Sequence, residues 1–157
     1  YLVSSTLHTN DAPSALTRLM DMGVKPFLVA SGIRAVMAQR LLRRVCKNCA
    51  EPTAPTEEEL RFLRLDEDYF GNATLLKGKG CSECINGYKG RVGIFEIFML
   101  DESIQTLIYE RASASTVRAR ARTLGMRTLR EDGLRKAATG ITTLEEVIRI
   151  TATDEPM

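Results

Sequence analysis

Cys46-Lys47-Asn48-Cys49 and Cys81-Ser82-Glu83-Cys84 contain all four cysteines of the chain, as two matched C-x-x-C pairs separated by residues 50–80. Two sulfurs three positions apart on a tight turn can bind one metal ion from the same side. A second pair then completes a tetrahedral shell of four thiolates, which is the shell that structural zinc prefers. The spacing therefore predicts a zinc site at Cys46, Cys49, Cys81 and Cys84.

Other interpretations of the four cysteines are two disulfides, an iron–sulfur cluster or four unrelated buried thiols. Disulfides are disfavoured because nothing in the sequence marks a secreted chain, and adjacent C-x-x-C bridges tend to be redox-active rather than structural. A dithiol redox protein would need a cysteine of lowered pKa and no bound metal. The spacing favours zinc over these alternatives.

The overall composition is that of a globular protein. Hydrophobic residues make up 44% of the 157 residues and charged residues 27%, which suits a soluble cytoplasmic protein with a core. The net charge of +2 gives no global nucleic-acid or membrane signature. No apolar run approaches the roughly 20 residues of a membrane-spanning helix, and no signal peptide is visible. Because the chain starts at Tyr1 in what reads as a strand, we expect a fragment of a larger protein.

Charge is distributed in blocks along the chain. Residues 34–49 carry five basic side chains and no acidic one, residues 50–70 carry seven acidic ones, and residues 77–91 are basic again. One interpretation is that these blocks are solvated faces with some internal pairing. The other is that the basic stretches contact phosphates or anionic lipid.

Periodicity and capping signals predict a mixture of strands and helices. Strands are expected over residues 1–6, 34–45 and 92–100. Helices are expected from Asn10 or Asp11 to Gly23, from Pro26, after the capping box at residues 56–59, from Asp101 or Ser103, from Ser115 to Gly125, over residues 128–138, and after a second capping box at residues 143–146.

These elements divide the chain into three expected domains. Residues 1–45 belong to an α/β core, residues 46–92 form a tetracysteine zinc-binding module, and residues 93–157 form a strand and a small helical bundle. An insert as small as the zinc module buries little apolar area, so the metal is expected to supply much of its stability.

The only histidine, His8, lies just after the predicted opening strand and just before a capped helix. This is where α/β folds place residues that contact ligands. The hydroxyls of Thr6 and Thr9, the Asn10 amide and the His8 imidazole together suit the sensing of a phosphate or a polarised water. A lone histidine is more often a structural group, so His8 by itself decides nothing.

Several motifs together resemble the secretion-superfamily ATPases that drive type II secretion and type IV pilus assembly. The segment at residues 6–12, TLHTNDA, resembles the His box of that family. The resemblance continues in order through residues 17–19, 22–27, 38–41, the tetracysteine module with its exit at 87–96, then 125–127, 132–134 and 140–147. It covers nearly the whole chain with independent motifs, which makes it far more specific than any one of them.

The resemblance implies an α/β fold that contains the C-terminal part of a RecA-like ATPase core, with an inserted zinc module and a C-terminal helical bundle. The whole motor would be a homohexamer that uses ATP and Mg, peripheral to the cytoplasmic face of the inner membrane. His8 would be catalytic, near the γ-phosphate, and the cysteines would hold the family's structural zinc. Residues 10–13 look closer to the pilus-extension branch than to the secretion branch. The resemblance places five further residues near the nucleotide or a subunit contact: Thr6, Thr9, Arg18, Gln39 and Arg40.

The chain departs from the family in lacking a phosphate-binding loop. No G-x-x-x-x-G-K-[ST] segment is present, and the glycine–lysine run Gly78-Lys79-Gly80 lacks the spacing of that motif. The acidic strand end that handles magnesium is also missing. Phosphoryl transfer depends on these groups, so the chain alone is predicted not to hydrolyse ATP.

The expected partners follow from charge and from the family's location. Lys77, Lys79 and Lys89 are expected to contact an inner-membrane platform protein or an anionic membrane surface. The rival hypothesis is a freestanding zinc ribbon that binds nucleic acid through the basic stretches. Nucleic acid is not expected, because tryptophan is absent and aromatic residues near the cysteines are few, Tyr88 being the main one.

Overall fold

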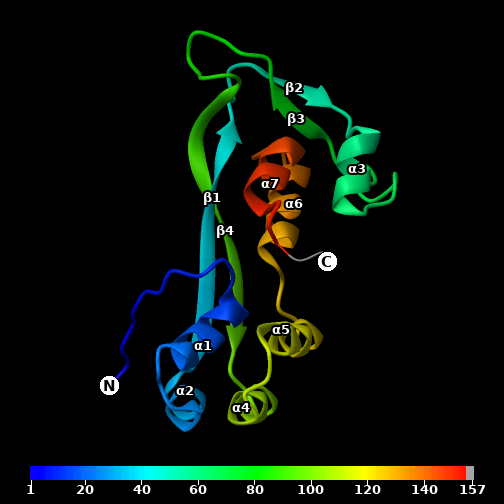
Figure 1. Cartoon of the computed structure of the whole chain (residues 1–157). Helices are drawn as coiled ribbons and strands as arrows, with labels where there is room; N and C mark the ends of the chain where they lie inside the picture. The colour runs from blue at the N-terminus through cyan, green and yellow to red at the C-terminus, as the bar shows by residue number, and fades with distance from the viewer. Residues whose placement is uncertain (155–157) are drawn as a thin grey trace. The chain divides into compact units, whose positions relative to one another are not determined.

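The computed structural model describes residues 1–154 as a mixed helix-and-sheet protein (Figure 1). The strands form two separate two-stranded sheets, β1 with β4 and β2 with β3. In chain order the elements are α1 (Ala12–Asp21), α2 (Pro26–Gly32), β1 (Ala35–Val45), β2 (Ala50–Thr53), α3 (Glu57–Leu63), β3 (Leu75–Gly78), β4 (Tyr88–Met99), α4 (Glu102–Tyr109), α5 (Ala114–Thr123), α6 (Leu129–Ala138) and α7 (Leu144–Thr151).

The chain folds into two compact units that each contain segments from both halves of the sequence. Unit 1 comprises Tyr1–Gln39 and Phe95–Arg127, and unit 2 comprises Arg40–Ile94 together with the described residues from Thr128 onward. Strands β1 and β4, which pair with each other, each contribute residues to both units. The cysteines all belong to unit 2, and the His8 segment belongs to unit 1.

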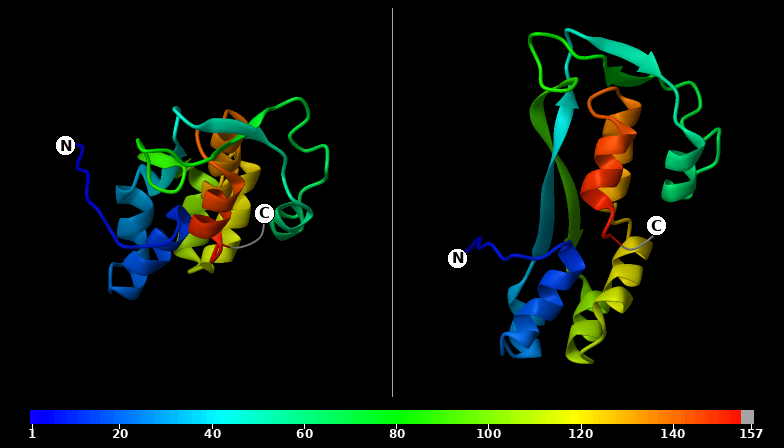
Figure 2. Two further views of the ribbon diagram at one scale, coloured as in Figure 1. Left: turned by 90° about the horizontal axis from the view of Figure 1, so that it is seen from above. Right: turned by 45° about the horizontal axis from the view of Figure 1, so that its top comes forward.

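Unit 1 is a helical assembly in which α1 packs on α2 and α5, and α4 packs on α2 and α5 (Figures 1 and 2). Helix α1 begins as the sequence predicts, because the Asp11 carboxylate accepts the Ser14 N–H at 2.8 Å and Pro13 occupies the first turn. Its apolar stripe is buried together with residues of the other helices and of β4. The buried core consists of Ala12, Leu16, Val29, Ala30, Phe98, Ile104, Ile108, Val117, Ala121 and Met126.

Unit 2 combines the antiparallel β2–β3 hairpin with helices α3, α6 and α7. The hairpin register runs from Ala50 opposite Gly78 to Thr53 opposite Leu75. Helices α6 and α7 lie side by side (Figures 1 and 2), and a Cβ on Gly133 of α6 would come within 3.0 Å of a Val147 methyl group. Glycine at this position therefore lets α6 and α7 approach closely.

Most of the predicted elements are present. The structure confirms the helices predicted after Asp11, from Pro26, after the Thr56 capping box and over residues 128–138. Both long strands are also confirmed, although β4 begins at Tyr88, earlier than expected. Both hydrogen bonds of the first capping box form, with Thr56 N–H to Glu59 at 2.9 Å and Glu59 N–H to the Thr56 hydroxyl at 3.1 Å. Helix α5 is capped by Ser113 and not started by Ser115.

One expectation about the fold is wrong, and a second is not confirmed. Residues 1–6 were expected to be a strand, but they have no regular secondary structure and are exposed. A strand needs a hydrogen-bonded neighbour, and residues 7–154 provide none for this segment. The single helical bundle expected after residue 93 is not confirmed either, because α4 and α5 pack in unit 1 whereas α6 and α7 pack in unit 2. The functional division at residues 45 and 92 stays a prediction, as does the RecA-like core.

Candidate metal centre

The four cysteines lie in two turns at the open end of the β2–β3 hairpin. Cys46 follows β1 and Cys49 precedes β2, whereas Cys81 and Cys84 lie between β3 and β4. The hairpin loop is at the Thr53 end, so both turns emerge at the opposite end. The Lys79 N–H donates to the Cys49 carbonyl at 3.0 Å and continues the pairing into the turns. Two segments that are distant in sequence are thereby held side by side.

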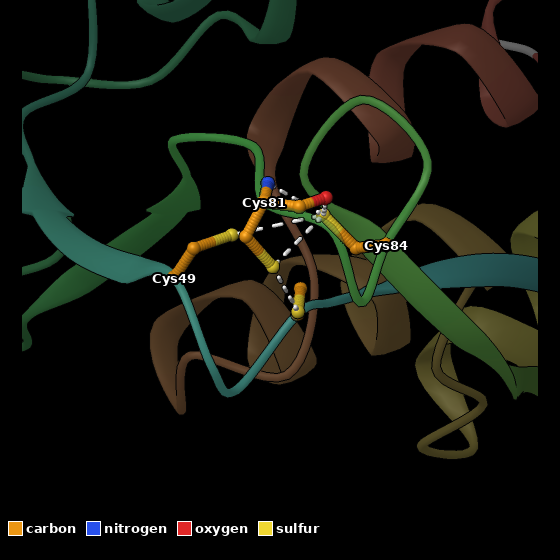
Figure 3. Close-up of side chains that lie close together, drawn as sticks. Cys49, Cys81 and Cys84 are labelled. Atoms are coloured by element: carbon orange, nitrogen blue, oxygen red, sulfur yellow. Dashed lines mark hydrogen bonds between the residues drawn. The ribbon is translucent and has the colours of Figure 1, made fainter.

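The four sulfurs converge on one point. All four Sγ atoms lie within 4.8 Å of one another, and the side chains of Cys49, Cys81 and Cys84 lie close together in Figure 3. Individual distances are 3.9 Å from Cys46 to Cys81, 3.8 Å from Cys49 to Cys84 and 3.6 Å from Cys81 to Cys84. Zinc–sulfur bonds of about 2.3 Å place tetrahedral sulfurs about 3.8 Å apart. Disulfide sulfurs are bonded at about 2.05 Å, so these four free thiols have the spacing of a metal site.

Three N–H groups are directed at the sulfurs. The Asn48 side-chain amide donates to Cys81 Sγ, the Gly80 backbone donates to Cys49 Sγ, and the Cys81 backbone donates to Cys84 Sγ, each at 3.3 Å. Donors of this kind stabilise thiolates and hold metal ligands in a fixed orientation. The turns therefore supply both the ligands and the groups that support their ionised form.

The environment moves the pKa of two of the thiols in opposite directions. Removal from water is the main cause that raises the pKa of Cys49 to about 11. The Asn48 hydrogen bond is the main cause that lowers the pKa of Cys81 to about 7. Cys81 is therefore the first of these two to ionise as the pH rises. Binding of a metal displaces the thiol protons, because the thiolate is the ligand form.

Two glycines allow the second turn to lie against β3. A Cβ on Gly78 would lie 2.1 Å from the Gly87 carbonyl oxygen, and a Cβ on Gly87 would lie 2.4 Å from that of Gly78. Gly87 also has a φ of +84°, a conformation that residues with a Cβ rarely adopt. The Cys46 N–H donates to the Gly87 carbonyl at 2.9 Å. This close approach fixes Cys46 beside the segment that follows Cys84.

A polar cluster holds the start of β4 next to the cysteine turns. The Arg43 guanidinium lies 4.2 Å from the Tyr88 ring centroid, and the Tyr88 hydroxyl is 2.7 Å from the Thr143 hydroxyl. Glu146 is fully buried and accepts hydrogen bonds from Arg43 and Arg149, the shortest being 2.8 and 2.7 Å. Burial raises the pKa of Glu146, but the hydrogen bonds from Arg149 and Arg43 outweigh it and lower the pKa to about 2. Glu146 is therefore ionised at neutral pH.

The same contacts explain a difference from the expected second capping box. Thr143 caps α7 as predicted, accepting the Glu146 N–H at 3.1 Å. The Glu146 carboxylate does not return to the Thr143 N–H, because it is engaged by the two arginines. Sequence reasoning recognised the helix start and missed the buried ion pair, whose only signal was an acidic residue close to the apolar face of α7.

Residues of the His box lie in the irregular segment that precedes α1. His8 and Thr6 are exposed, and within residues 1–154 the His8 imidazole has no hydrogen-bond or ion-pair partner. Thr9 is half-buried, and its hydroxyl donates to the Asp11 carbonyl at 3.0 Å. The expected roles of these residues at a nucleotide stay predictions.

The other three residues expected near the nucleotide are on α1 and β1. Arg18 is exposed on α1, and Gln39 is exposed on β1. Arg40 is half-buried and forms an ion pair with Asp154 at 2.8 Å within unit 2. A nucleotide role for these three residues also stays a prediction.

An ionic network lies directly after the His box and was not expected from the sequence. The carboxylate of Asp11, besides capping α1, pairs with Arg118 of α5. Arg118 also pairs with Glu96 of β4 at 3.4 Å. Glu96 is only 1% exposed, and it accepts the Ala12 N–H at 2.9 Å. One residue of α5 thus connects the start of α1 with β4 inside unit 1.

The sequence did contain a signal for this network. Glu96 is two residues from Ile94 and two from Phe98, so the three side chains lie on the same face of β4. Ile94 and Phe98 are both buried, which makes this the apolar face. A charged residue at such a position requires a buried partner. Only the fold identifies Arg118, more than twenty residues later, as that partner.

These observations define the class of the protein. It is a mixed helix-and-sheet protein with a cluster of four cysteines at the end of a hairpin between two long paired strands. Within residues 1–154, no helix has the length and hydropathy required to cross a membrane.

The chain belongs to the type II/IV secretion system protein family, whose model matches residues 1–149. It is 50% identical over 149 residues to the type IV pilus assembly ATPase PilB of Thermus thermophilus, covering 94% of this chain and 17% of that protein. It is 45% identical over 152 residues to the type II secretion system protein E of Pseudomonas aeruginosa, covering 96% of this chain and 30% of that protein. The type II secretion system ATPase E of Vibrio cholerae is 41% identical over 152 residues, again 96% of this chain and 30% of that protein.

The chain thus spans less than a third of the length of these relatives. The resemblance inferred from the motifs is confirmed at the level of the family. The expectation that the chain corresponds to the C-terminal part of such a protein stays a prediction.

Proposed function

We propose that this chain is a segment of a hexameric, ATP-hydrolysing motor that powers type IV pilus assembly or type II protein secretion. The observation that carries the proposal is its similarity to proteins named as ATPases of these two systems, at 40 to 50% identity over almost the whole chain. This similarity favours the motor over the freestanding zinc ribbon. The sequence of residues 10–13 favours the pilus-assembly branch over the secretion branch.

The segment does not carry the complete catalytic machinery. Its sequence has no phosphate-binding loop and no acidic strand end for Mg, so ATP turnover requires these groups from a longer protein. His8 is the residue of this segment that we assign to the nucleotide, close to the γ-phosphate. Its exposure and lack of partners within residues 1–154 leave the imidazole available for such a contact.

The four cysteines are proposed to hold a structural zinc ion. Sulfur separations of 3.6 to 3.9 Å support this assignment, and so do the N–H donors directed at the sulfurs. When bound, zinc would tie the two turns together and would supply no catalysis, because four protein ligands leave no open position. The cysteine module would then act as a rigid attachment between β1 and β4.

The remaining partners are proposed from the family and from charge. The motor would work at the cytoplasmic face of the inner membrane, against a platform protein. Lys77 and Lys89 are exposed, and so is Lys79, whose ammonium group lies 3.7 Å from the Glu51 carboxylate. These lysines are proposed to contact the platform protein or the anionic membrane surface.

The test is a chimera in which this chain replaces the matching segment of the Thermus relative. The chimera is expected to hydrolyse ATP, and His8→Ala in the chimera is expected to reduce kcat by ~10²-fold or more. The isolated chain is expected to show no turnover above background. A matched control is Arg111→Ala in the chimera, which changes an exposed residue outside the His box and should leave kcat unchanged.

Two results would contradict the proposal. One is His8-dependent ATP hydrolysis by the isolated chain, and the other is an inactive chimera that nevertheless folds and assembles. A second chimera with the Pseudomonas secretion protein distinguishes the branches. The pilus assignment predicts that the first chimera supports its system better than the second.

A further inference from the structure

Unit 2 contains an open pocket of about 410 Å³ beside the first cysteine turn. Its walls come from three short segments that the paired strands bring together. The end of β1 provides Arg44 and Val45, the first cysteine turn provides residues 46–48, and the start of β4 provides Lys89, Gly90 and Arg91. The volume falls within the range of pockets that bind small molecules.

The lining of this pocket is cationic. Arg44, Lys47, Lys89 and Arg91 contribute four positive charges, and no acidic residue lines the pocket. Lys89 is partly compensated by Glu83, with 3.1 Å between its ammonium group and the carboxylate. Within residues 1–154, the side chains of Arg44, Lys47 and Arg91 have no ion-pair partner. Several like charges around one concave surface attract a multiply charged anion.

Among the residues that the structure describes, the cations of the pocket are not engaged by hydrogen bonds to the cysteine cluster. Four thiolates around one divalent ion would carry roughly two negative charges. The donors that face the sulfurs are amide N–H groups, among them the side chain of Asn48 and the backbone of Gly80. None of the four cationic side chains of the pocket donates a hydrogen bond to a cysteine sulfur in the described part of the chain. The cations therefore remain available to a ligand from outside the chain.

We propose that this pocket binds the phosphate group of a phosphorylated anion. The planar guanidinium groups of Arg44 and Arg91 match the geometry of phosphate oxygens, and the lysine ammonium groups add point charges. Gly90 lines the pocket between Lys89 and Arg91 and adds no side chain to it. No aromatic ring lines the pocket, so a nucleotide base would find no stacking surface. Recognition would thus rest on the phosphate.

This site is made of other residues than the proposed nucleotide contact. The pocket lies entirely in unit 2, whereas His8 belongs to unit 1. The inference does not depend on ATP hydrolysis, and it can be tested on the chain even if the motor assignment fails. The phosphate can come from a soluble compound or from a lipid headgroup, and the experiment separates these sources.

The experiment titrates the zinc-loaded chain with inorganic pyrophosphate and follows amide chemical shifts by nuclear magnetic resonance. Shifts are expected at residues 44–48 and 89–91. Arg91→Glu is expected to weaken binding at least about tenfold, since it replaces a charge-assisted contact by a repulsive one. Arg61→Glu is the matched control, because it makes the same charge change at an exposed residue of unit 2 outside the pocket, and it should leave binding within about twofold.

Zinc content is measured in every variant before and after titration. Should Arg91→Glu lose metal or unfold, Lys47→Gln provides a second variant, with an expected loss of about fivefold to tenfold. Tricarballylate serves as a carboxylate of similar charge. Equal affinity for pyrophosphate and tricarballylate would overturn the proposal that the pocket recognises phosphate.

The second arm measures sedimentation with mixed phosphatidylglycerol–phosphatidylcholine vesicles and with pure phosphatidylcholine vesicles. Binding to the mixed vesicles alone, lost in Arg91→Glu, would support the site with a lipid as the phosphate source. Pyrophosphate binding without vesicle binding would support a soluble ligand. Binding of neither probe, or equal weakening by Arg61→Glu and Arg91→Glu, would overturn the proposal.

Discussion

Unit 1 and the β2–β3 hairpin of unit 2 are stabilised by different physical means. In unit 1, four helices share one apolar core in which Leu16, Ile104 and Ile108 have no exposed surface. In unit 2, strand β2 of the hairpin has little apolar cover, because Glu51, Pro52 and Thr53 are all exposed, and Leu75 is the one fully buried residue of β3. The hairpin is instead closed by the four convergent cysteines at its open end.

The difference indicates that the two regions need different sources of stability, apolar packing in unit 1 and the proposed metal ligation in the hairpin. A segment as short as the hairpin buries too little apolar area to offset the entropy of ordering it. The proposed ligation of a metal by the cysteines of both turns would supply the missing free energy. Unit 1 is therefore expected to be insensitive to metal, and the hairpin of unit 2 to depend on it.

The largest expected effect comes from removing one of the four cysteines of unit 2. Cys81→Ser removes one thiolate ligand, and structural zinc in small modules contributes about 10 kcal/mol or more to folding. The variant is expected to lose zinc and to show fast amide exchange over residues 46–92, while α1, α4 and α5 keep their protection. Hydrogen exchange with mass spectrometry measures both regions in one experiment. Ser82→Ala in the same turn is the control, and equal loss of protection in both units by Cys81→Ser would refute the prediction.

The second effect concerns the buried carboxylate of unit 2. Glu146 has a pKa of about 2 against an ordinary value of 4.5, which corresponds to about 3 kcal/mol of stability at neutral pH. Because the folded-state pKa is lowered, this contribution is complete above about pH 4.5 and is lost as the pH falls towards 2. Glu146→Gln is expected to destabilise by about 3 kcal/mol at pH 7, with the deficit shrinking below pH 4.

Urea denaturation at several pH values measures this deficit. Glu145→Gln is the matched control, because Glu145 is its exposed neighbour on α7. A deficit for Glu146→Gln that stays constant from pH 7 to pH 2 would show that the ion pairs with Arg43 and Arg149 are not its source.

The third effect tests the ionic network of unit 1. Arg118→Met leaves the buried Glu96 carboxylate without its arginine and is expected to destabilise unit 1 by about 2 kcal/mol. Adding Glu96→Gln should recover part of the loss, because the uncompensated charge is then removed. Denaturation followed by exchange of unit 1 amides measures the effect. Arg120→Met on the exposed side of α5 is the control, and a double variant less stable than the sum of the single ones would contradict the account.

The smallest effect concerns a helix cap in unit 2. Thr56→Ala removes the hydroxyl that accepts the Glu59 N–H at 3.1 Å and is expected to cost about 1 kcal/mol in local stability of α3. Amide exchange over residues 57–63 is the measurement. Thr53→Ala, at an exposed strand position, serves as the control. Equal exchange rates in the two variants would show that the cap does not stabilise α3.

Local signals in the sequence predicted the local structure. Asp11 with Pro13, the capping box at Thr56, the helix expected over residues 128–138 and the alternation of residues 92–98 all correspond to elements of the structure. The C-x-x-C spacing likewise predicted the cysteine cluster, because ligand pairs on tight turns need only a few residues to define their geometry. The prediction of a strand at residues 1–6 was wrong, because a strand depends on a partner strand that the local sequence pattern does not contain.

Long-range partners are what the sequence left open. Alternation placed Glu96 on an apolar face, but only the packing of α5 and β4 selects Arg118 as its partner. The assignment of α4 and α5 to one unit and of α6 and α7 to the other is equally non-local. The basic pocket exists because β1 and β4 pair and bring Arg44 and Arg91 to one surface.

By itself the sequence determined the helices, the two long strands, the four-cysteine site and the family resemblance, since each depends on residues close together in the chain or on a fixed motif. Tertiary structure alone decided which helices share a core, which charges are buried as pairs and where unpaired cations gather. These outcomes depend on contacts between segments distant in the chain, and periodicity carries no information about such contacts.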